Sequence, residues 1–380
     1  MQNSSRPKAL ISIDWFLPGT KSGGPVRSVA NMIDQLENID FYVVTRNNDY
    51  CSTEPYTTVL SNSWVQHSED TQVYYISDDQ LNKATLKRLI REVNPDVIYI
   101  NGMYSTPFSI WPLSVANQLQ LKTIVASRGM LSPHALAVKP LKKKIFLGLM
   151  NLKNAYKQVT FHATQLDEAK HIQKNIRNYK AIEVIPNLPR SVNHAAQTTI
   201  TKNKGQLKLI YLGRVAKEKG TLIALKALQQ CKGQVELDLF GTIYDEVYWE
   251  KCKAAIKTLP PKISVNYRGD LDSEKVIDTI KKHHFLLLFS AGENYGHANV
   301  ESFLSGRPVI ISKNTPWKAL EKEKAGFDVT EPTLSTALQK AIDMNQSEFN
   351  EWSKSAHQKG IYIANDATLM KKYKELLTKK

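Results

Sequence analysis

The sequence predicts an α/β protein made of two doubly wound domains. Three observations support this prediction: 380 residues suffice for two hydrophobic cores, short apolar runs recur with a helical pattern after each, and a polar stretch divides the runs into two series. Strands that alternate with helices form parallel sheets, which bind ligands beyond the carboxyl ends of their strands. We therefore expect two Rossmann-like domains that face each other across a cleft.

The first domain is predicted over residues 1–189 and contains seven candidate strands. These are the runs ALISID, FYVVTR, QVYYIS, DVIYING, TIVASRG, VTFHAT and EVIPN. Residues 190–206 follow two prolines, Pro186 and Pro189, and are polar with little periodicity, which is typical of a linker.

The second domain is predicted over residues 207–365, where five further runs alternate with helical stretches. These runs are LKLIYLGR, VELDLFG, ISVNYRG, FLLLFS and PVIIS. Residues 366–380 place four apolar side chains on one helical face, which predicts a terminal helix that packs back toward the first domain; they are Leu369, Tyr373, Leu376 and Leu377.

The composition is that of a folded, non-fibrous protein, with 42% apolar and 23% charged residues. The net charge of +15 favours phosphates, whether on nucleotides, nucleic acid or anionic lipid. The amino terminus lacks the pattern of a secretory signal and no apolar run reaches the length of a membrane span, so we expect a cytoplasmic protein. Cys51, Cys231 and Cys252 lie in no metal-like spacing and are expected to be reduced thiols.

Residues 290–302, SAGENYGHANVES, combine a loop and a helix start directly after a buried strand. The first amides of a helix that begins near His297 would bind an anion such as a pyrophosphate, and Gly296 would let it approach the backbone. Glu301, one turn into the helix, would then meet a ribose, and Glu293 would lie nearer the group that the phosphate carries. The spacing is equally compatible with Glu301 as a first-turn carboxylate and Glu293 as a solvated loop residue.

A second candidate is the loop Gly213–Gly220, which follows a strand of the same domain and carries Arg214, Lys217 and Lys219. Arg offers a planar fork of donors and Lys a point charge, a combination suited to two linked phosphates. Either cation alone is typical of a solvated loop, but the pair favours a phosphate site.

These motifs resemble those of the retaining glycosyltransferases of family 4, which have the GT-B fold. The resemblance rests on GRVAKEKG at 213–220 and on SAGENYGHANVESFLSGRPVI at 290–310, with its ExxxxxxxE pattern and GRPVI strand. It extends to PNLP before the linker, to PGTKSGGPVRSVANMIDQL at 18–36 and to ASRGMLSPHAL at 126–136.

The resemblance implies a role for each matching residue. Arg214 and Lys219 would hold the donor diphosphate, Glu301 the ribose hydroxyls, and Glu293 the donor sugar while the anomeric bond breaks. Backbone amides would assist with the diphosphate, and two glycines of the first domain would let its loop close over the phosphates; these residues are Gly296, His297, Ala298 and Asn299 in the second domain, and Gly23 and Gly24 in the first. A plain tight turn at the two glycines of the first domain remains an alternative, because they form no GxGxxG.

The chain departs from the family in its first domain, where many relatives carry a histidine after the fifth strand. Arg128 stands there, and His134 follows six residues later, either as a substitute or as a structural residue of the next helix. Both are candidate acceptor-side residues.

Two other patterns have competing interpretations. Asp270 and Asp272 mimic a metal-binding DxD, but the helix-like SEKVIDTIKK that follows favours Asp272 or Ser273 as an N-cap, so no metal is expected. Residues 139–157 place apolar side chains on one helical face and lysines elsewhere, which is typical of a helix resting on an anionic membrane or of one packed on its own sheet; the apolar residues are Leu141, Ile145, Leu149, Leu152 and Tyr156.

The resemblance thus implies a retaining, metal-independent glycosyltransferase with a nucleoside diphosphate sugar as donor and no cofactor. Its acceptor would be a hydroxyl of a free or lipid-linked glycan in cell-surface polysaccharide or lipopolysaccharide synthesis. The pattern at 139–157 adds an expected peripheral contact at the inner face of the membrane. Alternatives are a sugar-nucleotide epimerase or phosphorylase of the same fold, and a nucleic-acid-binding protein. The lysines are scattered over both halves and no recognition motif stands out, so no nucleic-acid partner is expected.

Overall fold

The computed structural model describes residues 6–191 and 198–379, which divide into two compact units. The first unit contains the chain up to Leu188 and the carboxyl-terminal segment from Ala367 onward, and the second unit is Pro189–Asp366. The chain therefore passes between the units twice. Each unit holds one sheet.

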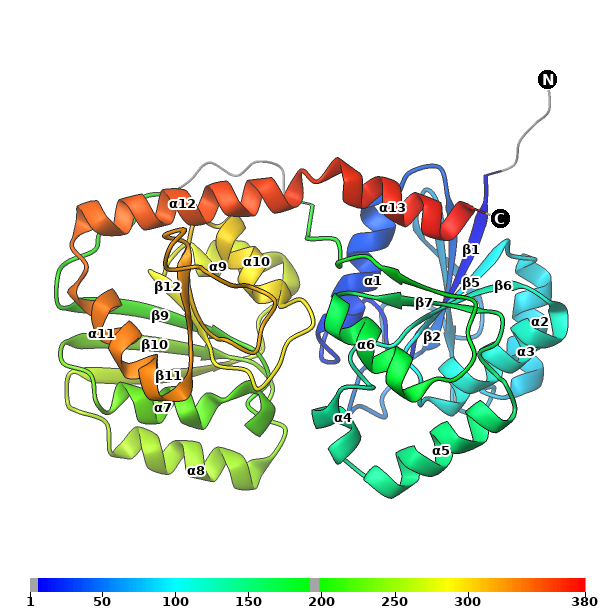
Figure 1. Ribbon diagram of the computed structural model, residues 1–380, viewed down its shortest axis with the longest axis horizontal. Helices are drawn as coiled ribbons and strands as arrows, with labels where there is room; N and C mark the ends of the chain where they lie inside the picture. Colours follow the sequence, from blue (N-terminus) through cyan, green and yellow to red (C-terminus); the bar gives the residue numbers. More distant parts are fainter. Residues whose placement is uncertain (1–5, 192–197, 380) are drawn as a thin grey trace. The chain divides into compact units, whose positions relative to one another are not determined.

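The sheet of the first unit has eight strands with helices on both faces (Figure 1). In spatial order they are β3 (Trp64–Ser68), β4 (Thr71–Ile76), β2 (Asp40–Arg46), β1 (Lys8–Ser12), β5 (Val97–Asn101), β6 (Lys122–Ala126), β7 (Val159–Ala163) and β8 (Ala181–Val184). All neighbours are parallel except β3, which pairs antiparallel with β4 at the edge. The sequence predicted seven strands and missed β3, because its side chains are half-buried or exposed and form no apolar run.

Helices cover both faces of this sheet, so its central strands have apolar side chains on both faces. In β5, Ile98 and Ile100 pack in one cluster, whereas Val97 and Tyr99 pack in a cluster with α1 and α13 on the other face. The helices are α1 (Gly24–Gln35), α2 (Lys83–Val93), the π-helix η1 (Thr106–Ile110), α3 (Trp111–Leu119), α4 (Pro133–Ala137), α5 (Pro140–Leu152), α6 (Leu166–Asn175) and α13 (Ala367–Thr378).

The terminal helix α13 packs on the first unit through Leu369, Tyr373, Leu376 and Leu377, all buried. The Lys122 ammonium donates to the carbonyl oxygens of Leu376 and Lys379 at 2.7 and 2.6 Å. A cation at the carboxyl end of a helix satisfies its last carbonyls and the negative end of its dipole. This contact therefore fixes the end of the chain to the sheet.

The sheet of the second unit has six parallel strands. In spatial order they are β11 (Ile263–Gly269), β10 (Gln234–Phe240), β9 (Gln206–Leu212), β12 (Phe285–Leu288), β13 (Val309–Ser312) and β14 (Gly326–Val329). Numbered within the unit, this order is 3-2-1-4-5-6, which is that of the Rossmann fold. The prediction of two doubly wound domains is thus confirmed, although the sequence missed the edge strand β14, which is only four residues long.

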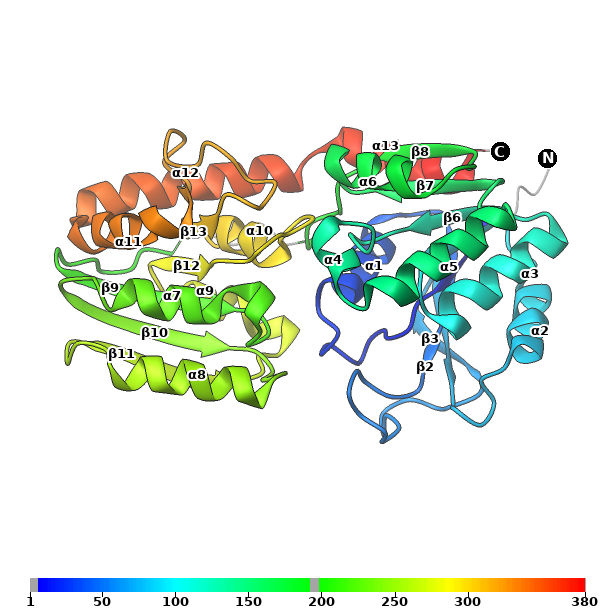
Figure 2. The same cartoon turned by 60° about the horizontal axis from the view of Figure 1, so that its bottom comes forward.

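Helices α7 and α8 lie on one side of this sheet, and α10 and α12 lie on the other, as Figures 1 and 2 show. The elements are the 3₁₀ turns η2 (Lys217–Lys219), η3 (Ser273–Lys275) and η4 (Glu331–Thr333), and the helices α7 (Thr221–Leu228), α8 (Glu246–Lys257), α9 (Val276–Ile280), α10 (His297–Leu304), α11 (Leu334–Asp343) and α12 (Gln346–Ala364).

The predicted linker 190–206 is, in its described part, attached to the second unit. The Lys202 side chain is buried and donates to the carbonyl oxygens of Ile342 and Met344 at 3.1 and 2.8 Å. The Arg307 guanidinium donates to the Thr198 carbonyl at 2.9 Å. The polar sequence predicted a linker, and the described part of this segment is held to the second unit by these hydrogen bonds to backbone carbonyls. Residues 192–197 of the predicted linker lie outside the described residues.

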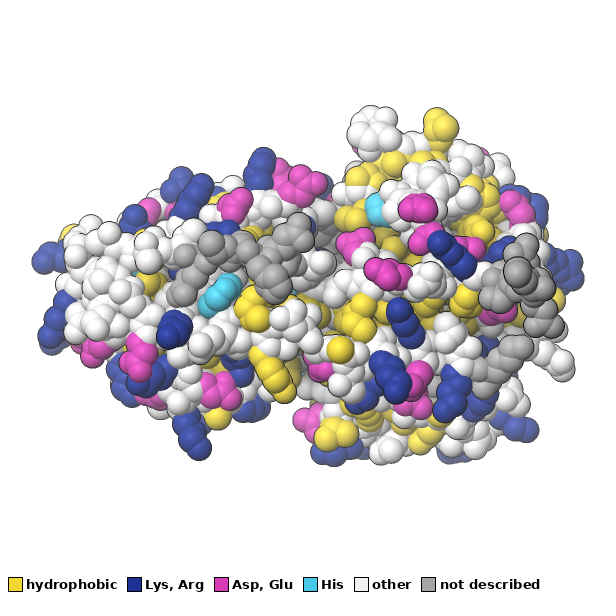
Figure 3. Space-filling model, turned by 90° about the horizontal axis from the view of Figure 1, so that it is seen from above, with side chains coloured by type: hydrophobic (Ala, Val, Ile, Leu, Met, Phe, Trp, Pro, Cys, Tyr) yellow, Lys and Arg dark blue, Asp and Glu magenta, His cyan; other side chains and the backbone are white. Residues whose placement is uncertain are grey.

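Figure 3 shows Lys and Arg side chains interspersed with Asp and Glu on the face that it presents, with no single basic patch there. No helix within residues 6–191 and 198–379 has both the length and the apolarity that crossing a bilayer requires.

Candidate functional site

In the second unit the strand order reverses between the neighbouring strands β9 and β12. The loop after β9 leads through η2 to α7, and the loop after β12 leads to α10. The Ala291 amide donates to the Glu218 carbonyl oxygen at 2.8 Å, so the two loops are in contact. Doubly wound sheets bind ligands at such a reversal, which makes this edge the candidate site.

Lys219 and Glu293 meet at this point. The Lys219 ammonium forms an ion pair with Glu293 Oε1, and Ser290 Oγ donates to the same oxygen at 2.8 Å. The side chains of Lys219 and Glu293 are only 22% and 15% exposed. The alternative of a solvated Glu293 is therefore wrong. Ser290 is a member of the site that sequence reasoning missed, although its position three residues before Glu293 was visible.

Gly220 allows the two loops to come this close. Its φ is +68°, and a Cβ at this position would lie 1.9 Å from the Phe289 carbonyl oxygen. A side chain would therefore both strain the backbone and push the loop after β9 away from the end of β12. Glycine at residue 220 thus brings Lys219 to Glu293.

Arg214 lies on the same loop but points to other partners. Its guanidinium lies 3.4 Å from Glu218 and is stacked at 5.3 Å over the ring of Tyr244. The buried Tyr211 hydroxyl donates to the carbonyl oxygens of Arg214 and Lys219 at 3.2 and 3.4 Å, so one side chain fixes the backbone of both cations. Lys219 therefore contacts Glu293 directly. Arg214 is connected to this pair only because it lies on the same loop as Lys219.

Helix α10 begins at His297, as the sequence predicted, and Gly296 precedes it with a φ of +78°. No side chain caps this end. The Asn299 amide is already engaged, because it donates to the Gly296 carbonyl at 3.0 Å. Of the amides expected at a phosphate, those of His297 and Ala298 lie in the first turn, where the helix dipole favours an anion.

Buried polar atoms without a hydrogen-bond partner gather around this helix start. Within the described ranges they include Asn294 Nδ2, the Tyr295 hydroxyl and both side-chain amide atoms of Asn299. Burial, with a smaller effect of the nearby Glu301 charge, raises the pKa of Tyr295, so its hydroxyl is a neutral donor. Orphaned buried groups are rare in folded proteins, and a cluster of them indicates a place for a ligand. Sequence reasoning missed Asn294 and Tyr295.

Glu301 is 4% exposed and lies in the second turn of α10. The alternative of a first-turn carboxylate is therefore wrong. Trp317 Nε1 donates to the Tyr295 carbonyl at 2.6 Å and holds the loop before the helix in place. The charge of Glu301 also acts on the Tyr295 hydroxyl, so these two buried side chains are neighbours inside the unit.

In the first unit, Gly23 and Gly24 form a turn at the start of α1. The Gly23 amide donates to the Thr20 carbonyl at 3.0 Å, and the φ and ψ of Gly23 are 78° and −127°, a conformation open to glycine. A Cβ at either glycine would meet no atom within 4 Å. The backbone conformation of the turn accounts for glycine at residue 23. A role of Gly23 and Gly24 at a phosphate stays a prediction.

Arg128 belongs to a polar network of the first unit. Its guanidinium donates to Asn101 Oδ1 and Asn187 Oδ1, each at 2.6 Å, and to the Tyr99 hydroxyl at 3.0 Å. These contacts join three segments of the unit, so most of its donors are already used. His134 is exposed on the short helix α4, as expected for a residue of the next helix.

Asp14 is a residue that sequence reasoning missed. It follows β1, and Ser105, which follows β5, donates to its carboxylate at 2.7 Å. The strand order of the first unit reverses between these two strands. Burial raises the pKa of Asp14, against the lowering effects of Ser105 and of Arg46. The only sequence signal was its place as the last residue of the predicted strand ALISID.

The described residues contain no cluster of metal-ligating side chains. Asp270 accepts a hydrogen bond from Thr242 at 2.7 Å, and Asp272 pairs with Lys275 at 2.7 Å on the surface. Asp272 stands at the N-cap position of η3, but its side chain makes no capping bond. Cys51, Cys231 and Cys252 are free thiols, as predicted.

Residues 194–358 match the family model of "Glycosyl transferases group 1". This match contains the two loops, the ion pair and α10, and it confirms the resemblance to group 1 glycosyltransferases for the motifs at 213–220 and 290–310. The sequence matches no curated protein.

Solved structures of glycosyltransferases share the GT-B fold of the chain over 98% of its length. Sucrose-phosphate synthase from Thermosynechococcus elongatus has 15% identity and a TM-score of 0.71, with 98% of that chain covered. HepE from Anabaena, in complex with UDP-glucose, has 16% identity and a TM-score of 0.69, with 99% covered. WaaG, a glycosyltransferase involved in lipopolysaccharide biosynthesis, has 12% identity and a TM-score of 0.70, with 100% covered.

Proposed function

We propose that this protein, with a group 1 glycosyl transferase match in its second unit and the GT-B fold, transfers a sugar from a nucleoside diphosphate donor to a hydroxyl of a glycan. The observation that carries this proposal is the ion pair of Lys219 and Glu293, held where β9 and β12 end. A cation for a phosphate and an anion for a sugar are thereby set side by side.

The donor diphosphate would bind at the loop after β9 and at the first turn of α10. Lys219 and Arg214 supply two positive charges, and the amides of His297 and Ala298 supply further donors. The HepE structures contain UDP and UDP-glucose, which supports a nucleotide donor here. The Tyr295 hydroxyl and the side-chain amide of Asn299, which have no hydrogen-bond partner, would bind the ribose or the base together with Glu301.

Glu293 would act on the sugar. As the anomeric bond breaks, positive charge develops on the sugar ring and negative charge on the leaving diphosphate. A carboxylate stabilises the first charge and Lys219 the second, and preorganised charges of this kind lower the barrier strongly. In the free protein each neutralises the other, which holds both side chains in position.

We propose that the anomeric configuration is retained and that the leaving phosphate takes the proton of the acceptor hydroxyl on the face of attack. This part rests on the family motifs. The glycosidic C–O bond to the acceptor forms as the C–O bond to the phosphate breaks. Proton NMR of the product, through the coupling of its anomeric proton, distinguishes retention from inversion.

On the first unit, Asp14 fits an acceptor-side role better than Arg128 or His134. Arg128 is engaged by three partners and His134 is exposed on a surface helix, whereas Asp14 lies at the strand-order reversal. Asp14→Asn is expected to raise KM for the acceptor and to leave donor affinity unchanged.

The experiment that tests the function is donor binding followed by transfer. A panel of UDP-, GDP- and ADP-sugars in a thermal-shift assay should contain one compound that stabilises the protein, by about 2.7 kcal/mol at roughly 100 times its Kd. That donor is then incubated with and without a glycan acceptor. Transfer only with acceptor supports the proposal, while a changed sugar without acceptor indicates an epimerase. Donor binding that survives Lys219→Ala with normal transfer would refute the site.

A further inference from the structure

Two aromatic side chains form a corner at the carboxyl edge of the first sheet. Trp15 comes after β1 and Tyr50 after β2, and these strands are neighbours in the sheet. The two ring centroids are 4.6 Å apart, and the ring planes meet at 74°. Trp15 is half-buried against the core of the unit, and within residues 6–191 and 198–379 its Nε1 donates to no acceptor. This aromatic corner, Trp15 with Tyr50, therefore offers part of a flat apolar surface and one donor that the fold leaves unused.

Hydrogen bonds of Asp49 hold the aromatic corner in place. Asp49 Oδ2 accepts from the backbone amides of Thr20 and Lys21 at 3.1 and 3.3 Å. Asp49 Oδ1 accepts from the Tyr50 amide at 2.7 Å. The loop after β1 and the loop after β2 are thus joined next to Tyr50. A site whose walls are fixed in advance loses less conformational entropy when a ligand binds.

Polar groups without partners lie next to the aromatic corner. Asp14 precedes Trp15 and is 21% exposed; its Oδ1 accepts from Ser105, whereas its Oδ2 accepts no hydrogen bond from the described residues. Arg46 Nε is buried without a hydrogen-bond partner in the described ranges and lies 3.9 Å from Asp14 Oδ1. Buried polar atoms are rarely left unpaired, so these groups indicate a place for a ligand.

The charge at this place is negative. Arg46 pairs with two carboxylates, Asp14 at 3.9 Å and Asp78 at 2.8 Å. In the part of the chain that the structure describes, it is the one cation within ion-pair distance of either carboxylate. One negative charge is therefore unbalanced, which repels a phosphate or a carboxylate and favours donors such as hydroxyls.

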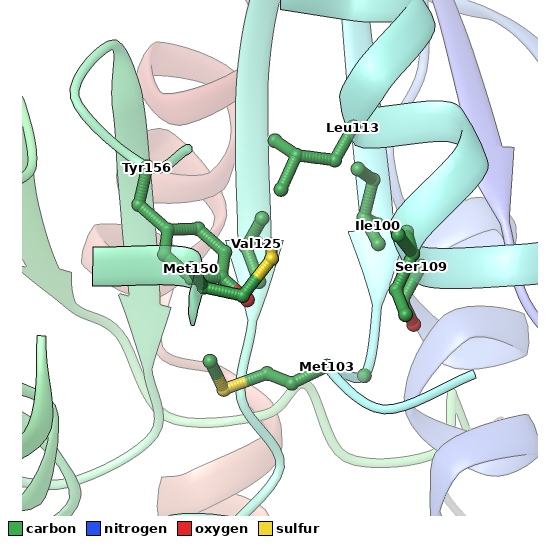
Figure 4. Close-up of a pocket in the computed structure, with 9 residues that line it drawn as sticks. Ile100, Met103, Ser109, Leu113, Val125, Met150 and Tyr156 are labelled. Atoms are coloured by element: carbon green, nitrogen blue, oxygen red, sulfur yellow. The ribbon is translucent and has the colours of Figure 1, made fainter. Parts of the chain in front are cut away.

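The apolar space behind η1 is not a second site. Figure 4 shows Ser109, Met150 and Tyr156 among the residues around this void, which is too small to hold a water molecule. Tyr156, which the sequence grouped with the apolar face of residues 139–157, is instead buried beside the void. The π-helix η1 is thus packed on its inner side, and its N-cap residue Ser105 contacts Asp14.

We propose that the aromatic corner and Asp14 bind the terminal sugar of the acceptor, with the apolar face of a neutral pyranose on the Trp15 indole and its hydroxyls on Asp14 Oδ2. The C–H groups of a sugar face meet an aromatic ring favourably, and a few placed polar groups then fix the orientation. A lipid tail would use only the apolar corner, and a phosphate would be repelled. The inference rests on the proposed function, because it names the class of its acceptor: a neutral sugar unit without phosphate or carboxylate.

Fluorine NMR of the full chain tests this subsite without any donor. Fluorotryptophan labels all six tryptophans, and the signal that disappears in Trp15→Phe belongs to Trp15. Methyl glucoside, methyl galactoside and methyl mannoside are titrated separately at millimolar concentrations. At least one of them should shift the Trp15 signal and leave the Trp64 signal unchanged. Trp64 is the matched control, because it is half-buried in the same unit between two tyrosine rings.

Charge selectivity is the second measurement. The methyl uronide of the sugar that binds carries a carboxylate in place of a hydroxymethyl group, and it should bind at least about fivefold more weakly. Asp14→Asn should weaken the neutral glycoside by about three- to tenfold, since a charged acceptor is lost. The same variant should reduce the difference between the neutral glycoside and its uronide.

A further variant separates stacking from general apolar contact. Trp15→Leu keeps apolar volume without a flat ring and should weaken the neutral glycoside by about tenfold in saturation-transfer NMR. With the sugar donor present, it should raise the KM for a neutral glycan acceptor by a similar factor and leave the kcat nearly unchanged. Trp64→Leu should change neither value. If Trp15→Leu does not fold, Trp15→Phe replaces it, with an expected loss of about threefold.

Absence of a Trp15 shift with every glycoside would overturn the proposal. Equal shifts of the Trp15 and Trp64 signals would do the same, as would a uronide that binds more tightly than its neutral sugar. Transfer with a normal acceptor KM in Trp15→Leu would uphold the proposed function and refute the subsite. Glycoside binding at Trp15 in a chain that binds no nucleotide sugar would uphold the sugar site and refute the proposed function.

Discussion

The substitution Glu293→Gln separates the charge of Glu293 from its shape. The carboxylate is 15% exposed and accepts from Lys219 and from Ser290 Oγ. Glutamine keeps an oxygen that accepts both hydrogen bonds, so only the charge is lost. The cost in stability is therefore about 1 kcal/mol, or roughly 2–4 °C in Tm for a unit of this size.

The effects on binding and on catalysis should have opposite signs. A diphosphate charge about 8 Å from the Glu293 carboxylate is repelled by roughly 2 kcal/mol at an effective dielectric constant of about 20. Removal of this repulsion also frees Lys219 for the phosphate. With allowance for water at the edge of the site, the nucleoside diphosphate should bind about 5- to 30-fold more tightly. The kcat should fall by about 10²–10³-fold, because the charge that stabilises the reacting sugar is lost.

Isothermal titration with the nucleoside diphosphate of the best donor, and initial rates with donor and acceptor, measure both effects. Glu321→Gln is the control, because Glu321 forms an exposed ion pair with Lys340 in the same unit. Unchanged affinity together with a normal kcat in Glu293→Gln would refute the role of Glu293. Loss of both properties with a collapsed Tm would show that the residue is structural.

Three further predictions concern stability. Gly220→Ala should destabilise the second unit by about 3 kcal/mol or more and abolish donor binding, whereas Gly292→Ala, which meets no atom within 4 Å, should be near neutral; equal melting curves would contradict the proposed close approach. Arg128→Met should lower the stability of the first unit by about 3 kcal/mol, because Asn101, Asn187 and Tyr99 lose the hydrogen bonds of the guanidinium, and it should leave the affinity for the sugar donor unchanged. A raised KM for the glycan acceptor at full stability would instead make Arg128 a ligand residue. Burial lowers the pKa of His162 and of His284 to about 4 from an ordinary 6.5. Between pH 4 and pH 6.5 the unfolded chain therefore binds more protons than the folded protein. The stability that is present above pH 6.5 is lost as the pH falls toward 4. Guanidinium unfolding at pH 7 and pH 5 should differ by on the order of 2 kcal/mol per histidine, and equal values would contradict this prediction.

The alternation of apolar runs and helical patterns was enough to predict both sheets. The periodicity of side-chain burial is local, so a window of a few residues reveals a buried strand. The two missed strands lie at sheet edges, where one side of the strand has no neighbour. β3 is exposed over most of its length, and β14, GFDV, has a glycine and an aspartate among its four residues, so neither forms a continuous apolar run.

The basic loop, the helix start and the two glutamates of the candidate site were likewise visible in the sequence, because their residue types and spacing carry the chemistry. The partners within the site were not. The contact between Lys219 and Glu293 joins residues on two loops that only the sheet order brings together. The burial of Glu301, and the lack of partners for Tyr295 and Asn299, are also properties of packing.

The helix α5 divides most clearly what each level of structure determines. The sequence by itself determined that this segment is an amphipathic helix with lysines beside an apolar stripe, since helical spacing alone fixes which side chains share a face. Only the tertiary structure decided that Leu147 and Met150 face the sheet and that the stripe faces outward. The physical reason is that a helix with apolar residues on two sides can be packed on either, and the choice depends on the shape and the hydrogen-bond partners of the surface that receives it.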